Sequence, residues 1–213
     1  MQISAEIRWF WQNLPPPRLQ DWFCNADVNG PVAGGGKKRV DEYLIDPGQV
    51  ELGIKRRDGK KGAEVKGLVQ VLLDGLAVPP FTGPIELWTK WTSEPLDLRP
   101  YATISTVKRR WLRKFDTVGS IPQEIALDAD EKPLGGERLP DLGCNVELTE
   151  VTLPGGSVWW TAGFEAFGSL ETVRGSLTSV AKTLSARQPP ELEHGRLLSY
   201  PSWLKEVNPT PRA

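Results

Sequence analysis

Charged residues of both signs recur at every second position along several apolar segments of the chain. Glu6 and Arg8 flank Ile7, and Glu64 and Lys66 flank Val65 in the same way. Because successive side chains on a strand point to opposite faces, each segment has one apolar face and one charged face. A sheet that curls with its charged face inward would enclose a cavity able to hold a polyanion together with a divalent cation. A sheet with an ordinary solvated face shows the same alternation, and that alternative stays open.

The elements that must position these residues are predominantly strands. The clearest runs of alternation or β-branched residues fall at 2–11, 40–45, 50–56, 63–68, 85–91, 102–115, 123–130, 145–153 and 157–167. The segment 68–76 fits either a helix or a continued strand. Sequential strands usually pair with their neighbours, and closing about eight of them removes the exposed edges. We therefore expect an α+β, mainly β, protein built on an eight-stranded antiparallel closed barrel, or tunnel, with flanking helices.

One helix is clear, and it follows the last long strand. In residues 170–187 the apolar positions form a single stripe at helical period, with Ser169 as the N-cap and Pro189 after the end. A short helix is also expected over 19–24. The apolar face of the barrel would then lie outside, under the helices. We expect one domain over residues 1–213, with a frayed tail at about 208–213.

Composition excludes several classes of function. The chain has 213 residues, of which 39% are hydrophobic and 25% charged, and its net charge is −1. This balance argues against broad nucleic-acid binding. The two cysteines, Cys24 and Cys144, and the single histidine, His194, give no zinc-finger spacing and fit a reducing cytoplasm. We find neither a signal peptide nor a run of about 20 apolar residues, and so expect no membrane partner.

Six short segments, in order along the chain, resemble the CYTH-type triphosphate tunnel metalloenzymes. The segments are Glu6-Ile7-Arg8, Asp41-Glu42-Tyr43 with Leu52-Gly53-Ile54-Lys55-Arg56, Val65-Lys66-Gly67, Lys108-Arg109-Arg110-Trp111, Phe164-Glu165 and Ser199-Tyr200-Pro201-Ser202-Trp203-Leu204. The resemblance implies an eight-stranded tunnel with acidic and basic residues on its inner wall. It also implies hydrolysis or cyclisation of compounds that bear a linear triphosphate, with Mg²⁺ or Mn²⁺. The chain departs from the family pattern by losing charged residues at Ser4, Gly53 and Gly163.

The resemblance gives particular charged residues a role. Arginine and lysine satisfy phosphate oxygens by charge-assisted hydrogen bonds, and the candidates are Arg8, Lys55, Lys66, Lys108 and Arg110. Magnesium takes one or two carboxylates with phosphate oxygens and water, and the candidate ligands are Glu6, Glu147 and Glu165. Glu147 is also the candidate catalytic base. Glu64 and Glu86 could instead form salt bridges that orient the basic residues.

Three functions remain open on this basis. The first is a divalent-metal-dependent phosphohydrolase acting on a triphosphate-bearing compound, inorganic or organic. The second is a protein of the same fold that binds polyphosphate or a nucleotide without turning it over, which the missing acidic positions favour. The third is an unrelated β-barrel or sandwich with a structural or protein-interaction role, since the nine tryptophans and the balanced charge would suit a packed scaffold.

Overall fold

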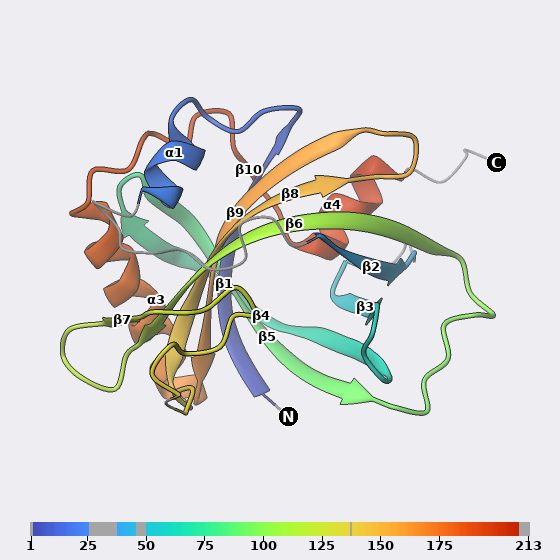
Figure 1. Cartoon of the computed structure of the whole chain (residues 1–213), viewed down its shortest axis with the longest axis horizontal. Helices are drawn as coiled ribbons and strands as arrows, with labels where there is room; N and C mark the ends of the chain where they lie inside the picture. The colour runs from blue at the N-terminus through green and yellow to red at the C-terminus, as the bar shows by residue number, and fades with distance from the viewer. Residues whose placement is uncertain (1, 26–37, 46–49, 137, 209–213) are drawn as a thin grey trace.

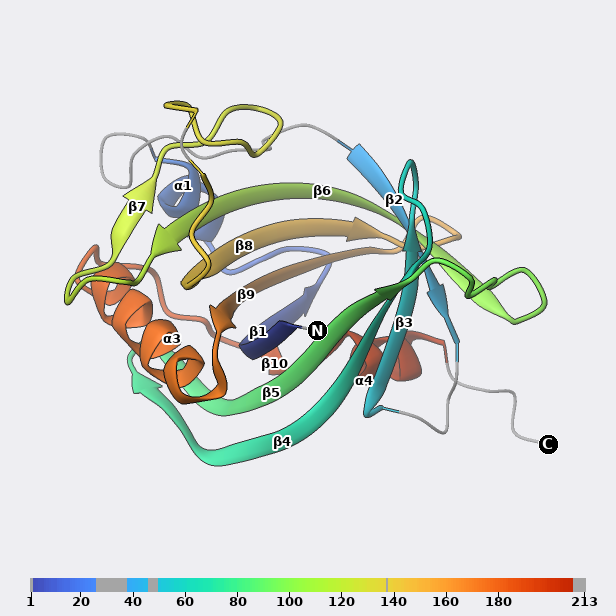
Figure 2. The same ribbon diagram turned by 90° about the horizontal axis from the view of Figure 1, so that it is seen from below.

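The computed structural model describes residues 2–25, 38–45, 50–136 and 138–208. Its framework is a ring of antiparallel strands: β1 (Gln2–Gln12), β2 (Lys38–Leu44), β3 (Leu52–Arg57), β4 (Ala63–Val78), β5 (Phe81–Ser93), β6 (Thr103–Asp116), β8 (Gly143–Thr152) and β9 (Val158–Gly168). They pair in the order β1-β5-β4-β3-β2-β6-β8-β9, and β9 pairs again with β1 (Figures 1 and 2). The predicted closed barrel of eight antiparallel strands is confirmed. The expected frayed tail falls largely on residues 209–213, outside the described part of the chain.

Three helices and two short strands complete the fold in the described part of the chain. They are α1 (Leu19–Cys24), β7 (Gln123–Ile125), α3 (Leu170–Ser185), β10 (Arg196–Leu197) and α4 (Tyr200–Val207). The strand predicted over 123–130 is wrong in length, because only Gln123–Ile125 pair with β6. Beyond it, the Asp128 carboxylate accepts the backbone N–H groups of Asp130 and Lys132 and folds the chain into a tight turn.

The main apolar core lies outside the ring, between the barrel wall and α3, as the sequence predicts. Val173, Val180 and Leu184 of α3 are fully buried in one cluster with Ile7 of β1 and Phe164 of β9. Figures 1 and 2 show α1 and α3 together on one side of the barrel. Because these strands turn their apolar residues outward to meet the helices, their charged residues turn inward.

A second apolar cluster lies inside the barrel, which the sequence did not predict. It gathers inward-facing Phe10 and Tyr43 with Trp203 of α4. The ring of Trp203 stacks on Phe10 at 5.1 Å and is fully buried. Helix α4 therefore fills one end of the bore, on the side opposite α1 and α3 (Figure 2). The charged lining consequently does not extend along the whole length of the barrel.

Segment 68–76, for which the sequence allowed a helix or a strand, is part of β4. Its residues pair with β5, with irregular register between Leu68 and Gln70 and again between Leu72 and Leu76. At the second irregularity the backbones approach so closely that a Cβ on Gly75 would lie 2.0 Å from the carbonyl oxygen of Gly83. A glycine is therefore required where β4 and β5 bend.

Candidate functional site

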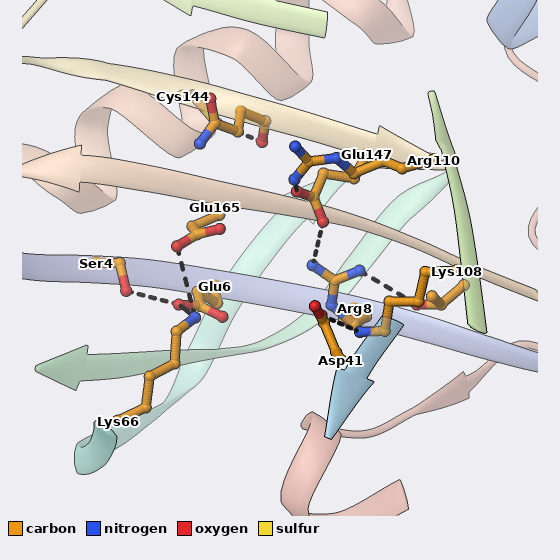
Figure 3. Close-up of polar contacts among 12 residues, drawn as sticks. Ser4, Glu6, Arg8, Asp41, Lys66, Lys108, Arg110, Cys144, Glu147 and Glu165 are labelled. Atoms are coloured by element: carbon orange, nitrogen blue, oxygen red, sulfur yellow. Dashed lines mark hydrogen bonds and ion pairs between the residues drawn. The ribbon is translucent and has the colours of Figure 1, made fainter. Parts of the chain in front are cut away.

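The charged residues that the sequence singled out come together on the inner face of the barrel. Figure 3 shows side chains from β1, β4, β6, β8 and β9 pointing toward one another across the bore. Their parity explains this, because positions 4, 6 and 8 of β1 share a face, as do 108 and 110 of β6. Arg109, between the last two, turns outward and lies over the ring of Trp111 at 4.9 Å. The candidate residues gathered here are Glu6, Arg8, Lys55, Lys66, Lys108, Arg110, Glu147 and Glu165.

Glu147 of β8 sits between two arginines. Its Oε2 accepts a hydrogen bond from Arg8 Nη2 at 3.1 Å, and its Oε1 accepts one from Arg110 Nη1 at 2.6 Å. Burial alone would raise the pKa of Glu147, but Arg110 and Arg8 outweigh it and hold that pKa well below its usual range. A carboxylate with such a low pKa takes up a proton poorly at neutral pH. Glu147 therefore orients the two arginines, and its role as catalytic base stays a prediction.

Lys66 of β4 contacts one carboxylate from β1 and one from β9. Its ammonium lies 2.6 Å from Glu6 Oε1 and 3.5 Å from Glu165 Oε1. The two glutamates face each other because β1 and β9 pair them directly. Burial would lower the pKa of Lys66, but Glu165 and Glu6 outweigh it and raise the pKa above its usual range. Lys66 is therefore charged at neutral pH, and Lys90 of β5 also contacts Glu165, at 3.1 Å.

Lys108 of β6 is the most enclosed of the predicted phosphate-binding residues. Its ammonium donates to the Tyr43 hydroxyl, lies 3.4 Å from Asp41 Oδ2 and sits 3.7 Å above the ring of Tyr200. Only 1% of Lys108 is exposed. Burial holds its pKa well below the ordinary value for lysine. Lys108 lies on the expected face, but the two tyrosines cover it.

Lys55 of β3 and Arg8 face a cavity of about 100 Å³ beside the Lys66 cluster. Lys55 pairs with Glu64 at 3.0 Å, as the sequence predicts for that glutamate. Glu86 differs from the expectation, because it accepts a hydrogen bond from Trp88 Nε1 at 3.0 Å. The walls of this inner cavity come from β1, β3, β4 and β5 on the barrel side and from α4 at its end. Its charged lining includes Glu6, Arg8, Lys55, Glu64, Lys66 and Glu86.

A wider recess of about 720 Å³ opens at the other mouth of the barrel. Lys90, Lys114, Asn145, Glu165 and Phe167 contribute to its walls. Glu165 faces this recess, whereas Lys66, its ion-pair partner, lines the inner cavity. The contact between Lys66 and Glu165 therefore lies at the boundary between the two spaces.

Local packing accounts for two of the three positions where the chain lacks the charge that the resemblance leads one to expect, Gly163 and Gly53. A Cβ on Gly163 would lie 3.0 Å from the guanidinium carbon of Arg8, so glycine leaves room for that side chain. A Cβ on Gly53 would lie 3.1 Å from Pro201 of α4. Ser4 donates a 2.6 Å hydrogen bond to Glu6 Oε1. The arginine of β1 and the helix at the end of the bore therefore occupy the space that longer side chains would need.

Several residues of the site were not predicted as functional. Asp41 is completely buried and lies within 4.0 Å of cationic groups on Arg39, Lys55, Arg57 and Lys108. Asp41 lies two residues before Tyr43 on β2, so the sequence could have placed both on the same face of the sheet. Glu86 and Lys90 of β5 are likewise an even number of residues apart and share a face. Glu131 had no such signal because it lies in a loop, yet it forms an ion pair with Arg110.

The acidic residues are distributed among these ion pairs. Within residues 2–25, 38–45, 50–136 and 138–208, no three acidic, histidine or cysteine side chains lie together in a way that would hold a metal ion. Glu6 and Glu165 do share one cation, because both carboxylates contact the ammonium of Lys66. Two carboxylates are the number that magnesium commonly takes when phosphate oxygens and water supply its other ligands. The assignment of Glu6, Glu147 and Glu165 to a metal stays a prediction.

Comparison with known proteins adds no relative. No family model matches the chain, and no curated protein matches it either. In the described part of the chain, no helix has the length and apolar character needed to cross a membrane. The functional argument consequently depends on the barrel interior itself.

Proposed function

We propose that the chain binds a compact, phosphate-rich anion inside the barrel, either a compound bearing a linear triphosphate or a polyphosphate. The observation that carries this proposal is the inner cavity, whose wall presents Arg8, Lys55 and Lys66 together. These three cations come from three different strands and are held in place by glutamates. Convergent, prepositioned cations favour a small ligand with many oxygens over a flat macromolecular surface.

The size of the cavity supports the same class of ligand. A water takes up about 30 Å³ of liquid volume, so a cavity of about 100 Å³ has room for about three waters. That volume suits a phosphate group or a short phosphate chain. The resemblance noted above agrees, because the charged residues to which it gives a role all face the bore. We therefore also propose that the chain is a divergent relative of the CYTH-type family, and the free thiols of Cys24 and Cys144 fit a cytoplasmic location.

Lys66→Met should weaken binding of tripolyphosphate, because it removes a partly buried ammonium from the cavity and keeps most of the side chain's volume. We expect the dissociation constant, measured by isothermal titration calorimetry, to rise about tenfold to a hundredfold, as for loss of a charge-assisted contact. Lys61→Met is the matched control, since Lys61 is exposed on the turn between β3 and β4. Equal affinities of the two variants and the unmodified protein would remove the inner cavity as the binding site.

Metal-dependent hydrolysis of the bound anion is the second candidate, and the meeting of Glu6 and Glu165 at one cationic position favours it. A divalent cation bound there with the phosphates would offset negative charge that builds up on the leaving group. In this chain, Arg8 and Lys55 would hold the phosphate oxygens. Glu147 would keep Arg8 and Arg110 oriented toward them.

The enzyme and the binding protein are separated by a phosphate-release assay with tripolyphosphate, ATP and thiamine triphosphate, with Mg²⁺ or Mn²⁺. If the chain is an enzyme, Glu6→Gln should lower metal-stimulated release by about 10-fold to 100-fold, as loss of a group that positions a metal commonly does. Tripolyphosphate binding should persist in that variant. Absence of release with all three substrates, alongside tight binding, would leave the binding protein as the function.

A further inference from the structure

The guanidinium of Arg110 is already occupied by a carboxylate that comes from outside the barrel wall. Nε of Arg110 donates to Glu131 Oε1 at 3.0 Å, and Nη2 pairs with the second oxygen of the same carboxylate. Its remaining terminal nitrogen, Nη1, binds Glu147 on β8. Glu131 thus forms a bidentate pair with the edge of the guanidinium that Glu147 leaves available.

Glu131 belongs to a compact turn in the connection between β7 and β8. The Asp128 backbone N–H donates to the Lys132 carbonyl at 2.8 Å, and the Glu131 N–H donates to the Asp128 carbonyl at 3.0 Å. Glu131 has a φ of 65°, a left-handed conformation that costs a non-glycine residue about 1 kcal/mol or more. Glycine or asparagine would adopt this conformation more easily. A glutamate at this position therefore indicates that its side chain is used.

The pair is accessible as well as specific. The side chain of Glu131 is 30% exposed and that of Arg110 is 14% exposed. Partly exposed ion pairs contribute little net stability, so another anion can replace the carboxylate at small cost. The planar guanidinium binds carboxylate and phosphate with the same two-point geometry. Glu131 accordingly occupies a position that suits two oxygens of a phosphoryl group.

We propose that Glu131 is an internal competitor for the phosphate-binding edge of Arg110, which a phosphoryl group of the ligand must displace. This inference rests on the proposed function, since it concerns the same charged interior. Ligand binding breaks the contact between Glu131 and Arg110 and releases the 128–132 turn. Anions that present two free oxygens to Arg110 can replace both hydrogen bonds of Glu131. Anions that offer only one oxygen cannot, so Glu131 disfavours their binding.

Two variants test the competition by calorimetry with tripolyphosphate at one pH and ionic strength. Glu131→Gln should lower the dissociation constant about threefold to tenfold, the range for a partly exposed ion pair. Glu131→Asp keeps the negative charge but shortens its reach, and we expect it to behave like Glu131→Gln. Glu191→Gln, which neutralises an exposed glutamate after α3, should change nothing. An unchanged affinity in Glu131→Gln, or a Glu131→Asp affinity equal to that of the unmodified protein, would overturn the proposal.

Amide hydrogen exchange supplies a second readout on the unmodified protein. Saturating tripolyphosphate should increase exchange at residues 128–132, because the turn loses its contact with Arg110. If the anion binds and exchange in the turn stays the same, the internal competitor is wrong while the proposed function stands. If neither the unmodified protein nor Glu131→Gln binds tripolyphosphate, the proposed function fails and this inference fails with it.

Discussion

Replacing Trp203 with alanine is expected to destabilise the protein by about 3–5 kcal/mol, the range for removing a buried tryptophan from a core. Trp203 is fully buried in the end of the bore. It stacks on Phe10 and meets Trp159 and Tyr200 edge-on, with ring centroids 5.9 and 5.8 Å away. Alanine would leave a large void among these rings, which strands of a closed barrel cannot collapse to fill.

Urea unfolding followed by circular dichroism measures this loss without relying on tryptophan fluorescence. The matched control is Trp91→Ala on β5, because 42% of Trp91 is exposed. Its cost should be about 1 kcal/mol or less, as for most substitutions at partly exposed positions. Similar losses in the two variants would show that α4 does not form part of the cooperative structure.

Asp41→Asn is expected to destabilise the protein by about 3–5 kcal/mol, the usual cost of breaking a buried ion pair on one side. Asp41 is the only carboxylate within ion-pairing distance of Lys108 among the described contacts, at 3.4 Å. Both residues are buried, so the substitution leaves the Lys108 side chain without its carboxylate partner. Chemical denaturation at neutral pH measures the loss. Adding Lys108→Met to Asp41→Asn should restore much of the stability, because it removes the buried polar group that has lost its partner.

Asp74→Asn provides the matched control for Asp41. Asp74 pairs with Arg174 at 2.8 Å, but both side chains are about half or more exposed. Removal of an exposed pair of this kind costs about 0–1 kcal/mol. A loss in Asp41→Asn no larger than in Asp74→Asn would contradict the importance assigned to the buried charge.

The two Asp41 proteins should also differ in their response to acid. Burial alone would raise the pKa of Asp41, but Lys108, Lys55 and the neighbouring arginines outweigh it and hold that pKa below the usual range. A carboxylate with a lowered folded-state pKa stabilises the protein above its unfolded-state pKa of about 4, and this stability is lost as the pH falls. The difference between the unmodified protein and Asp41→Asn should therefore be constant near neutrality and shrink below about pH 4. A difference that does not shrink in acid would contradict this assignment.

The inward-facing set could be predicted because strand parity depends only on neighbouring residues. Glu6 and Arg8 share a face whatever surrounds them, and so do Lys108 and Arg110. Closure of the barrel could be predicted as well, because a sheet of many sequential strands leaves no exposed edge strand when it closes. The core beneath α3 was predictable for the same reason, from the helical period of its apolar stripe.

Contacts between distant segments could not be obtained this way. Trp203 stacks on Phe10 from the opposite end of the chain, and no local pattern links the two. Glu131 reaches Arg110 from a loop without periodicity. Glu147 likewise contacts arginines of two other strands with its two oxygens, which no pattern within β8 indicates. Local order gives the face of a residue, whereas its partner depends on how the whole chain closes.

The pairing of β1 with β9 has a consequence for the order of folding. Ten consecutive residue pairs join β1 to β9, from Ile3 with Gly168 to Gln12 with Trp159. Pairing two strands so far apart in the sequence closes a very long loop. The chain loses conformational entropy when this loop closes, before the contacts between the strands compensate for it, and folding is slower as a result. During synthesis, β1 emerges before β9, so the barrel cannot close until β9 has been made and pairs with β1. A nascent chain that stops before residue 158 exposes the unpaired edges of β1 and β8, and is at risk of aggregation.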